Sequence, residues 1–186
     1  MNREDLIGKW KINRIMTHPD GSPKGRMMGM GQFDLYEGNQ LLYQEQLWHE
    51  TENEDLLFAT KFYRYHFLDR SIAIYFYQEE NNRLFMTLNK GEHLPSKFSQ
   101  DQSLGFIPIK ALSHPIGKSH ADRGEKRNTD VGENQAFKYN RYKGNASCKE
   151  DRYSLTWDWI NMNHFMTRYQ TVGPKKNYII ESEFLR

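Results

Sequence analysis

The chain has 186 residues, enough for one domain with a sizeable hydrophobic core, and a single domain over 1–186 is expected. Its 26 basic and 24 acidic residues leave a net charge of +2, which gives no electrostatic basis for binding nucleic acid. No stretch approaches membrane-spanning length, and the N-terminal residues lack the apolar run of a signal peptide. The single cysteine, Cys148, excludes an internal disulfide, so we expect a cytoplasmic protein.

A period of two dominates the first half of the chain, as in strands with one buried face. After a short helical turn at NREDLI, this alternation predicts strands over 9–16, 30–37, 40–50, 56–68, 72–78 and 83–88. The segment THPDGSPKG (17–25) is rich in turn residues and predicts a loop. Aromatic residues form 14% of the chain, which favours strands over helices.

The alternation stops over 89–143, a stretch that is too long for an ordinary hairpin loop. Residues 117–135 have almost no apolar side chains, so we expect an insertion without its own core. The apolar segment SLGFIPIKAL (103–112) predicts a mobile flap that lays Leu104, Phe106, Ile107 and Ile109 on the open end of a barrel. A disordered tail without any role at the cavity is the alternative.

Alternation returns over 148–159, 164–173 and 175–186, which gives about nine strands in all. Short strands separated so regularly by polar turns predict an all-β fold, an antiparallel up-and-down barrel of about 8–10 strands. A barrel of this size is filled by side chains or holds one small ligand.

Gly8-Lys9-Trp10 on the first strand resembles the Gly-x-Trp signature of lipocalin-like, or calycin, barrels. The resemblance implies that Trp10 closes one barrel end and that a basic residue of the last strand, here Arg186, packs across it. The order of YQE, FYRYHF, CKEDRY and VGPKKNY is similar to an uncharacterised family of small lipocalin-like proteins, over 6–88 and 145–186. That family implies the barrel and no established activity. This chain departs from it at Asn145-Ala146-Ser147, where the family leads us to expect a His two residues before Cys148.

Strand alternation also assigns the barrel interior, since a shift of one residue would turn a whole strand face outward. The predicted ligand-binding residues are Tyr43, Glu45, Tyr63, Tyr65, Tyr153 and Trp157. Burial of Glu45 among tyrosines would raise its pKa and suit it as a base or a ligand anchor. We favour the other interpretation, a structural ion pair of Glu45 with Arg64, Arg14 or Arg168, because such pairs also perturb pKa values.

Cys148, Asp151 and Tyr153 lie close together in SCKEDRY, at a predicted strand start. No His neighbours Cys148 in the sequence to act as its base, although His66 or His164 could approach it in space. We therefore favour a buried, inert thiol, with Asp151 capping a turn, over a nucleophile.

The remaining candidates favour ordinary structural roles. His93, His114 and His120 lack the spacing of a metal motif, so no metal site is predicted. No cofactor is predicted either, with a haem held by His164 alone as the minority alternative. GPKK (173–176) predicts a solvated hairpin turn rather than an anion site, and the methionines 27, 28 and 30 predict core filling rather than a ligand mouth.

The leading interpretation is a lipocalin-like barrel that binds a small, mostly apolar or aromatic ligand. An enzyme of isomerase, cyclase or lyase type, with Glu45 and cavity tyrosines as acid–base groups, is the first alternative. An interaction module acting through 89–143 is the second. The fold does not decide among them. A titrating group inside the barrel would favour the enzyme, whereas an arginine paired with Glu45 would favour binding or structure.

Overall fold

The computed structural model describes residues 2–50, 56–77, 83–91 and 140–186. Within these ranges the chain forms one short 3-10 helix and ten strands. They are η1 (Arg3–Leu6), β1 (Gly8–Thr17), β2 (Pro23–Leu35), β3 (Gln40–Glu50), β4 (Leu56–Phe67), β5 (Ser71–Phe76), β6 (Leu84–Lys90), β7 (Asn140–Cys148), β8 (Asp151–Asn161), β9 (His164–Val172) and β10 (Asn177–Leu185).

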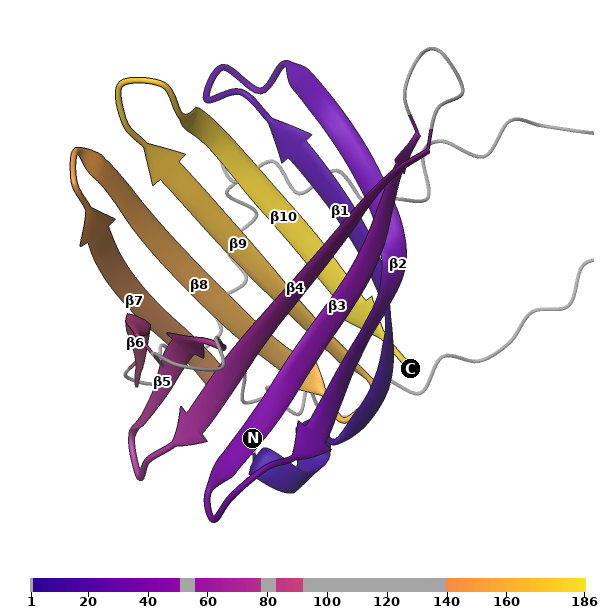
Figure 1. The fold of residues 1–186 in the computed structure, drawn as a ribbon, viewed down its shortest axis with the longest axis vertical. Coiled ribbons are helices and arrows are strands. Elements are labelled where there is room, and N and C mark those ends of the chain that lie inside the picture. The colour runs from indigo at the N-terminus through magenta and orange to yellow at the C-terminus, as the bar shows by residue number, and fades with distance from the viewer. Residues whose placement is uncertain (1, 51–55, 78–82, 92–139) are drawn as a thin grey trace, which may run out of the picture. The chain divides into compact units, whose positions relative to one another are not determined.

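Every strand pairs antiparallel with the next in the chain, and β1 also pairs with β10, so the sheet closes into an up-and-down barrel (Figure 1). The predicted fold class is therefore confirmed. No helix among the described residues is long and apolar enough to cross a membrane.

Alternation along each strand builds the core. In β3 the side chains of Leu41, Tyr43, Glu45 and Leu47 are buried inside the barrel, whereas Trp48 is 43% exposed on its outer face. The same alternation in the other strands encloses a mainly aromatic core, because the inward positions carry Trp, Tyr and Phe.

Trp10, Gly8 and Arg186 meet at one end of the barrel. The Trp10 ring is fully buried, and its indole N–H donates to the Leu6 carbonyl at 2.8 Å. The guanidinium of Arg186 lies 4.1 Å from the Trp10 ring centroid and donates to the Ile7 carbonyl. Gly8 has a φ of 115°, a conformation that favours glycine, where the chain passes from η1 into β1. These contacts cover the floor of the barrel.

β7 was not predicted from the sequence, and the predicted insertion over 89–143 is too wide. Asn89 and Lys90 belong to β6, and 140–143 belong to β7. Two of the inward residues of β7, Gly144 and Ala146, are small, so the strand lacks a clear apolar alternation. Gly144 is buried so close to β6 that a Cβ there would lie 2.3 Å from the Thr87 carbonyl oxygen.

Two further boundaries differ from the prediction. The expected loop over 17–25 ends early because β2 begins at Pro23, in a glycine-rich stretch that hides its alternation. Cys148 ends β7 instead of starting the next strand, because Lys149, with a φ of 56°, turns the chain into β8.

The connection between β6 and β7, residues 92–139, lies outside the described residues. The flap with Leu104, Phe106, Ile107 and Ile109 therefore stays a prediction. The described residues do show at which end of the barrel this connection leaves β6 and enters β7. Even-numbered strands run in one direction, so β6 ends at the same barrel end as β10, whose last residues adjoin Trp10. There the Gly91 N–H donates to the Arg141 carbonyl at 2.8 Å.

Candidate functional site

The barrel holds an open cavity of about 460 Å³ above the floor that Trp10 covers. Phe33, Trp157 and Phe165 form its base, and Arg83, Cys148 and Lys176 lie at its rim. The rim residues are at strand ends opposite to the Trp10 end, so the mouth opens there. The wall is lowest at β5 and β6, which have 6 and 7 residues and reach only part of the height of β4 and β8 (Figure 1).

All six residues predicted for the interior line this one cavity. They are Tyr43, Glu45, Tyr63, Tyr65, Tyr153 and Trp157. The Tyr43 and Tyr63 rings are stacked, with centroids 6.5 Å apart, and the Tyr65 ring meets the Trp157 ring edge-on at 5.7 Å. Their edge-to-face and stacked contacts build a continuous aromatic wall.

Burial makes the cavity tyrosines harder to ionise. It raises the pKa of Tyr63 to about 12, and it raises the pKa of Tyr43 and Tyr65 as well. The nearby Glu45 carboxylate adds to each shift, because a phenolate beside it would be repelled. These hydroxyls are therefore donors and acceptors, not bases, at neutral pH.

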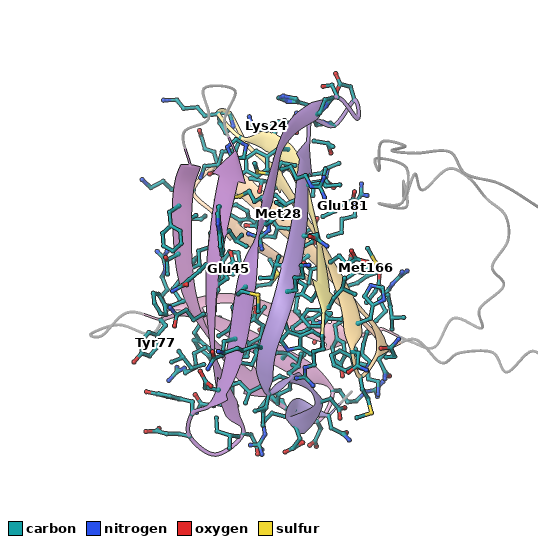
Figure 2. The ribbon with its side chains drawn as sticks, turned by 90° about the vertical axis from the view of Figure 1, so that its right-hand side faces the viewer. Lys24, Met28, Glu45, Tyr77, Met166 and Glu181 are labelled. Carbon is teal, nitrogen blue, oxygen red and sulfur yellow. The ribbon has the colours of Figure 1, made fainter. Side chains whose placement is uncertain are left out.

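Arg14 and Glu45 form a buried ion pair inside the barrel, with Glu45 about halfway along its length (Figure 2). The Arg14 Nη1 and Nη2 atoms donate to Glu45 Oε1 and Oε2 at 2.9 and 2.7 Å, and Nε donates to Ser182 Oγ at 2.8 Å. Tyr43 OH adds a fourth bond, to Glu45 Oε2 at 2.8 Å. The other two predicted partners lie elsewhere, since Arg64 stacks on Tyr75 and Arg168 pairs with Glu181.

The pKa of Glu45 is lowered, as fits the ion pair favoured from the sequence, and is not raised as it would be for a carboxyl group buried among tyrosines alone. Burial alone would raise it, and this is the largest single influence. The hydrogen bonds and charge of Arg14, with help from Lys61 and Tyr43, outweigh burial and favour the carboxylate. A carboxylate held in this way is a weak base, so the pair is a poor general-base site.

Three other charged residues line the cavity and were not predicted to be interior, namely Lys61, Arg83 and Lys176. Lys61 faces inward beside Glu45, with Nζ 4.0 Å from Glu45 Oε1. Its place was available from alternation, because Lys61 lies two residues before Tyr63 on the same strand face. Arg83 and Lys176 lie two residues before Phe85 and Tyr178, which also line the cavity, so alternation in the predicted strands 83–88 and 175–186 would place both inward as well.

At the rim, Asp151, Tyr153 and Lys176 form a hydrogen-bonded cluster. Lys176 Nζ and Tyr153 OH both donate to Asp151 Oδ2, at 2.8 and 3.1 Å. This contact explains why the GPKK turn lies against the β7–β8 hairpin. The expectation of a buried Cys148 is wrong, because the thiol is exposed at the mouth. Ala146, where the resemblance led us to expect His, also lines the cavity.

The remaining candidates do not line the cavity. His164 lies beside Glu183, with Nε2 3.2 Å from Glu183 Oε1, and is absent from the cavity wall, so nothing in this placement supports a haem ligand. Met28 and Met30 are exposed on the outer face of β2, against the expected core role, whereas Met27 packs on the core. Among the described residues no three His, Cys, Asp or Glu side chains gather as a metal site, and His93, His114 and His120 lie outside those residues.

Comparison with known proteins supports the fold. The S-type phycobiliprotein lyase CPES from Guillardia theta is similar over 99% of this chain and 89% of its own, with a TM-score of 0.55 and 5% identity. Rv2717c from M. tuberculosis is similar over 98% of this chain and 92% of its own, with a TM-score of 0.53 and 9% identity. Both likenesses show a shared lipocalin-like barrel and nothing further.

Sequence comparison gives a family without a known role. None of the curated proteins matches this chain. One family profile matches residues 6–102 and 129–186, most of the described barrel and parts of the insertion. The chain therefore belongs to DUF6314, a family of unknown function.

Proposed function

We propose that this barrel binds one small, mostly apolar or aromatic ligand in its cavity. The observation that carries the proposal is the open, aromatic-walled space of about 460 Å³. Pockets for small molecules are concave, mainly apolar and a few hundred Å³ in volume, with a small number of polar groups to orient the ligand. A barrel whose only task was stability would gain from filling this space with side chains.

Polar anchors for such a ligand are present in the wall. The buried indole N–H of Trp157 has no hydrogen-bond acceptor among the described residues. A ligand acceptor that reached the cavity floor would satisfy it, which matters because an unpaired buried donor costs free energy. The neutral hydroxyls of Tyr63 and Tyr65 lie in the same wall.

The enzyme alternative has less support. It requires Glu45 to exchange protons, but Arg14 holds both of its carboxylate oxygens and lowers its pKa. An interaction module acting through 89–143 rests mainly on residues outside those described. The prediction of a cytoplasmic location continues to rest on the lone cysteine.

Blocking the cavity tests the proposal. The neutral aromatic probe N-phenyl-1-naphthylamine should bind the full chain at one saturable site, read as a rise in its fluorescence. Ala146→Phe, which points a large ring into the cavity, should abolish binding. Asn145→Phe adds the same ring to the exposed outer face of β7 and should leave binding unchanged. Equal binding by both variants would place the probe outside the cavity and overturn the proposal.

A further inference from the structure

The charged groups around the cavity are mostly cationic. Among the described lining residues are four cations, Arg14, Lys61, Arg83 and Lys176, and one carboxylate, Glu45. Asp151 bonds to Lys176 at the rim and balances that charge. The remaining carboxylate, Glu45, is shared by two cations. The described part of the wall therefore carries an excess of positive charge, although the whole chain is close to neutral.

Lys61 is the cation with the least compensation inside the barrel. Its Nζ lies 4.0 Å from Glu45 Oε1, too far for a hydrogen bond, whereas Arg14 and Tyr43 bond directly to the same carboxylate. Partial burial and the charge of Arg14 lower the pKa of Lys61 by more than Glu45 raises it. An ammonium in this position gains from any further anion brought beside it.

Lys61 can also be reached from solvent. Its side chain is 48% exposed, and the paired residues of β4 and β5 begin only at Tyr63. Lys61 thus sits where the wall is lowest, between the mouth and the aromatic interior. A ligand that entered here would place one end beside Lys61 and the rest among aromatic rings.

Cations at the rim extend this arrangement. The Arg83 guanidinium lies 5.2 Å from the Phe76 ring centroid, and Lys176 Nζ lies 6.0 Å from the Tyr153 ring centroid. Between these two cations, Phe76, Phe85 and Tyr153 continue the aromatic wall, with successive centroids 4.8 and 5.9 Å apart. An apolar surface edged by cations is complementary to a molecule that is apolar along its length and anionic at one end.

We infer that the ligand is an anionic amphipath, with an apolar or aromatic body in the barrel and a carboxylate or phosphate head beside Lys61. This inference rests on the proposed function, because it assigns the chemistry of the molecule that the cavity binds. A charge-assisted bond from Lys61 fixes the head, and the buried Arg14–Glu45 pair stays intact below it.

Probes that share one chain and differ in the head group test the inference. Decanoate, decyl phosphate, decanol and decylamine are titrated into the full chain by isothermal titration calorimetry at one low ionic strength. The two acids should bind about tenfold more tightly than decanol, the gain expected for one charge-assisted bond, and decylamine should bind most weakly. Raising the salt concentration should weaken the acids and leave decanol unchanged.

Variants at Lys61 locate the head group. Lys61→Gln should bring the affinity for both acids close to that for decanol, while Lys61→Arg should keep the preference. Lys11→Gln removes the same charge from an exposed position on the outer face of β1 and should have no effect on the preference. An equal loss of preference in Lys11→Gln and Lys61→Gln would mean a general effect of charge and would overturn the assignment of Lys61.

The outcomes separate the two proposals. If none of the four probes binds, decanol included, the proposed function itself fails. If decanol binds and the acids bind no more tightly, the barrel binds apolar molecules and the anionic head group is wrong. Tightest binding by decylamine would overturn the head group in the same way. An acid preference for only one of decanoate and decyl phosphate identifies which head the site takes.

Discussion

Arg14 and Glu45 contact each other through two parallel hydrogen bonds of 2.9 and 2.7 Å, in an interior that is otherwise largely aromatic. Ser182 and Tyr43 occupy further hydrogen-bonding positions of the pair, so both charges are well satisfied. Such a pair gives little net stability compared with apolar residues of equal volume, but removal of one partner leaves a buried charge alone.

Removal of the Glu45 charge should therefore destabilise the barrel strongly. We expect Glu45→Gln to lower the free energy of unfolding by about 3–5 kcal/mol, because the Arg14 guanidinium stays buried without its counter-ion. The double variant Arg14→Met, Glu45→Met should recover most of that loss. Urea denaturation measures the free energy of unfolding of the natural chain, of Glu45→Gln and of the double variant. Glu181→Gln, which breaks the more exposed pair with Arg168, is the matched control and should cost less than about 1 kcal/mol. A similar small cost for Glu45→Gln would contradict the buried-pair account.

The same pair predicts how stability depends on pH. The pKa of Glu45 is lower in the folded chain than its ordinary value of 4.5, so the unfolded chain takes up this proton first as the pH falls. The contribution of Glu45 is fully present above about pH 4.5 and is lost as the pH falls through the folded pKa. The difference in unfolding free energy between the natural chain and Glu45→Gln, measured in urea, should shrink on acidification from neutral pH. A difference that stayed constant down to pH 3 would contradict the lowered pKa of Glu45 in the folded chain.

Trp10 should be a major contributor to stability. Its ring is fully buried between Arg186 and Phe165, with the Phe165 centroid 4.7 Å away. We expect Trp10→Ala to cost about 3–5 kcal/mol, as for other buried aromatic residues. Trp48→Ala removes the same side chain from the outer face of β3, where it is 43% exposed, and should cost far less. Thermal or urea unfolding compares the stability of the two variants. Equal losses of stability would show that burial of Trp10 at the barrel end is not important for the stability of the fold.

Cys148 should react readily in the folded protein. Because the thiol is exposed at the mouth, its rate with Ellman's reagent should lie within roughly tenfold of the rate in the unfolded chain. Attachment of a bulky maleimide should also reduce the binding of N-phenyl-1-naphthylamine, since Cys148 lines the cavity. Cys148→Ser treated with the same maleimide is the control. A native rate suppressed a thousandfold would restore the buried thiol that the sequence led us to expect.

The sequence predicted the barrel and the direction of most inward side chains because both follow from a period of two. Tyr43 and Tyr63 could be assigned without coordinates, since each lies in a long alternating segment. The partner of Glu45 was left open among three arginines, because the register of neighbouring strands decides which guanidinium meets it. Arg14 is also inward on β1, and it reaches Glu45 on β3 across β2, which pairs with both strands.

The alternation of apolar residues did not predict β7, because this strand is held by contacts of its backbone more than by contacts of its side chains. Gly144 and Ala146 carry almost no apolar signal, yet β7 is a full strand because β6 and β8 supply the hydrogen bonds. Cys148 was misjudged for a different reason. A cysteine is usually buried, but its burial depends on the height of the wall around it, and no local pattern records that.

Pairing of β1 with β10 has a consequence for the order of folding. Lys11 lies opposite Leu185, so two strands that are far apart in the sequence are neighbours in the sheet. On the ribosome, β1 can pair with β2 early, but its other edge stays open until β10 has emerged. Contacts between residues so distant in sequence slow folding. Until the ring closes, the sheet has a free edge that can pair with another chain, so a folding intermediate in which β10 is not yet in place should be the species most prone to aggregation.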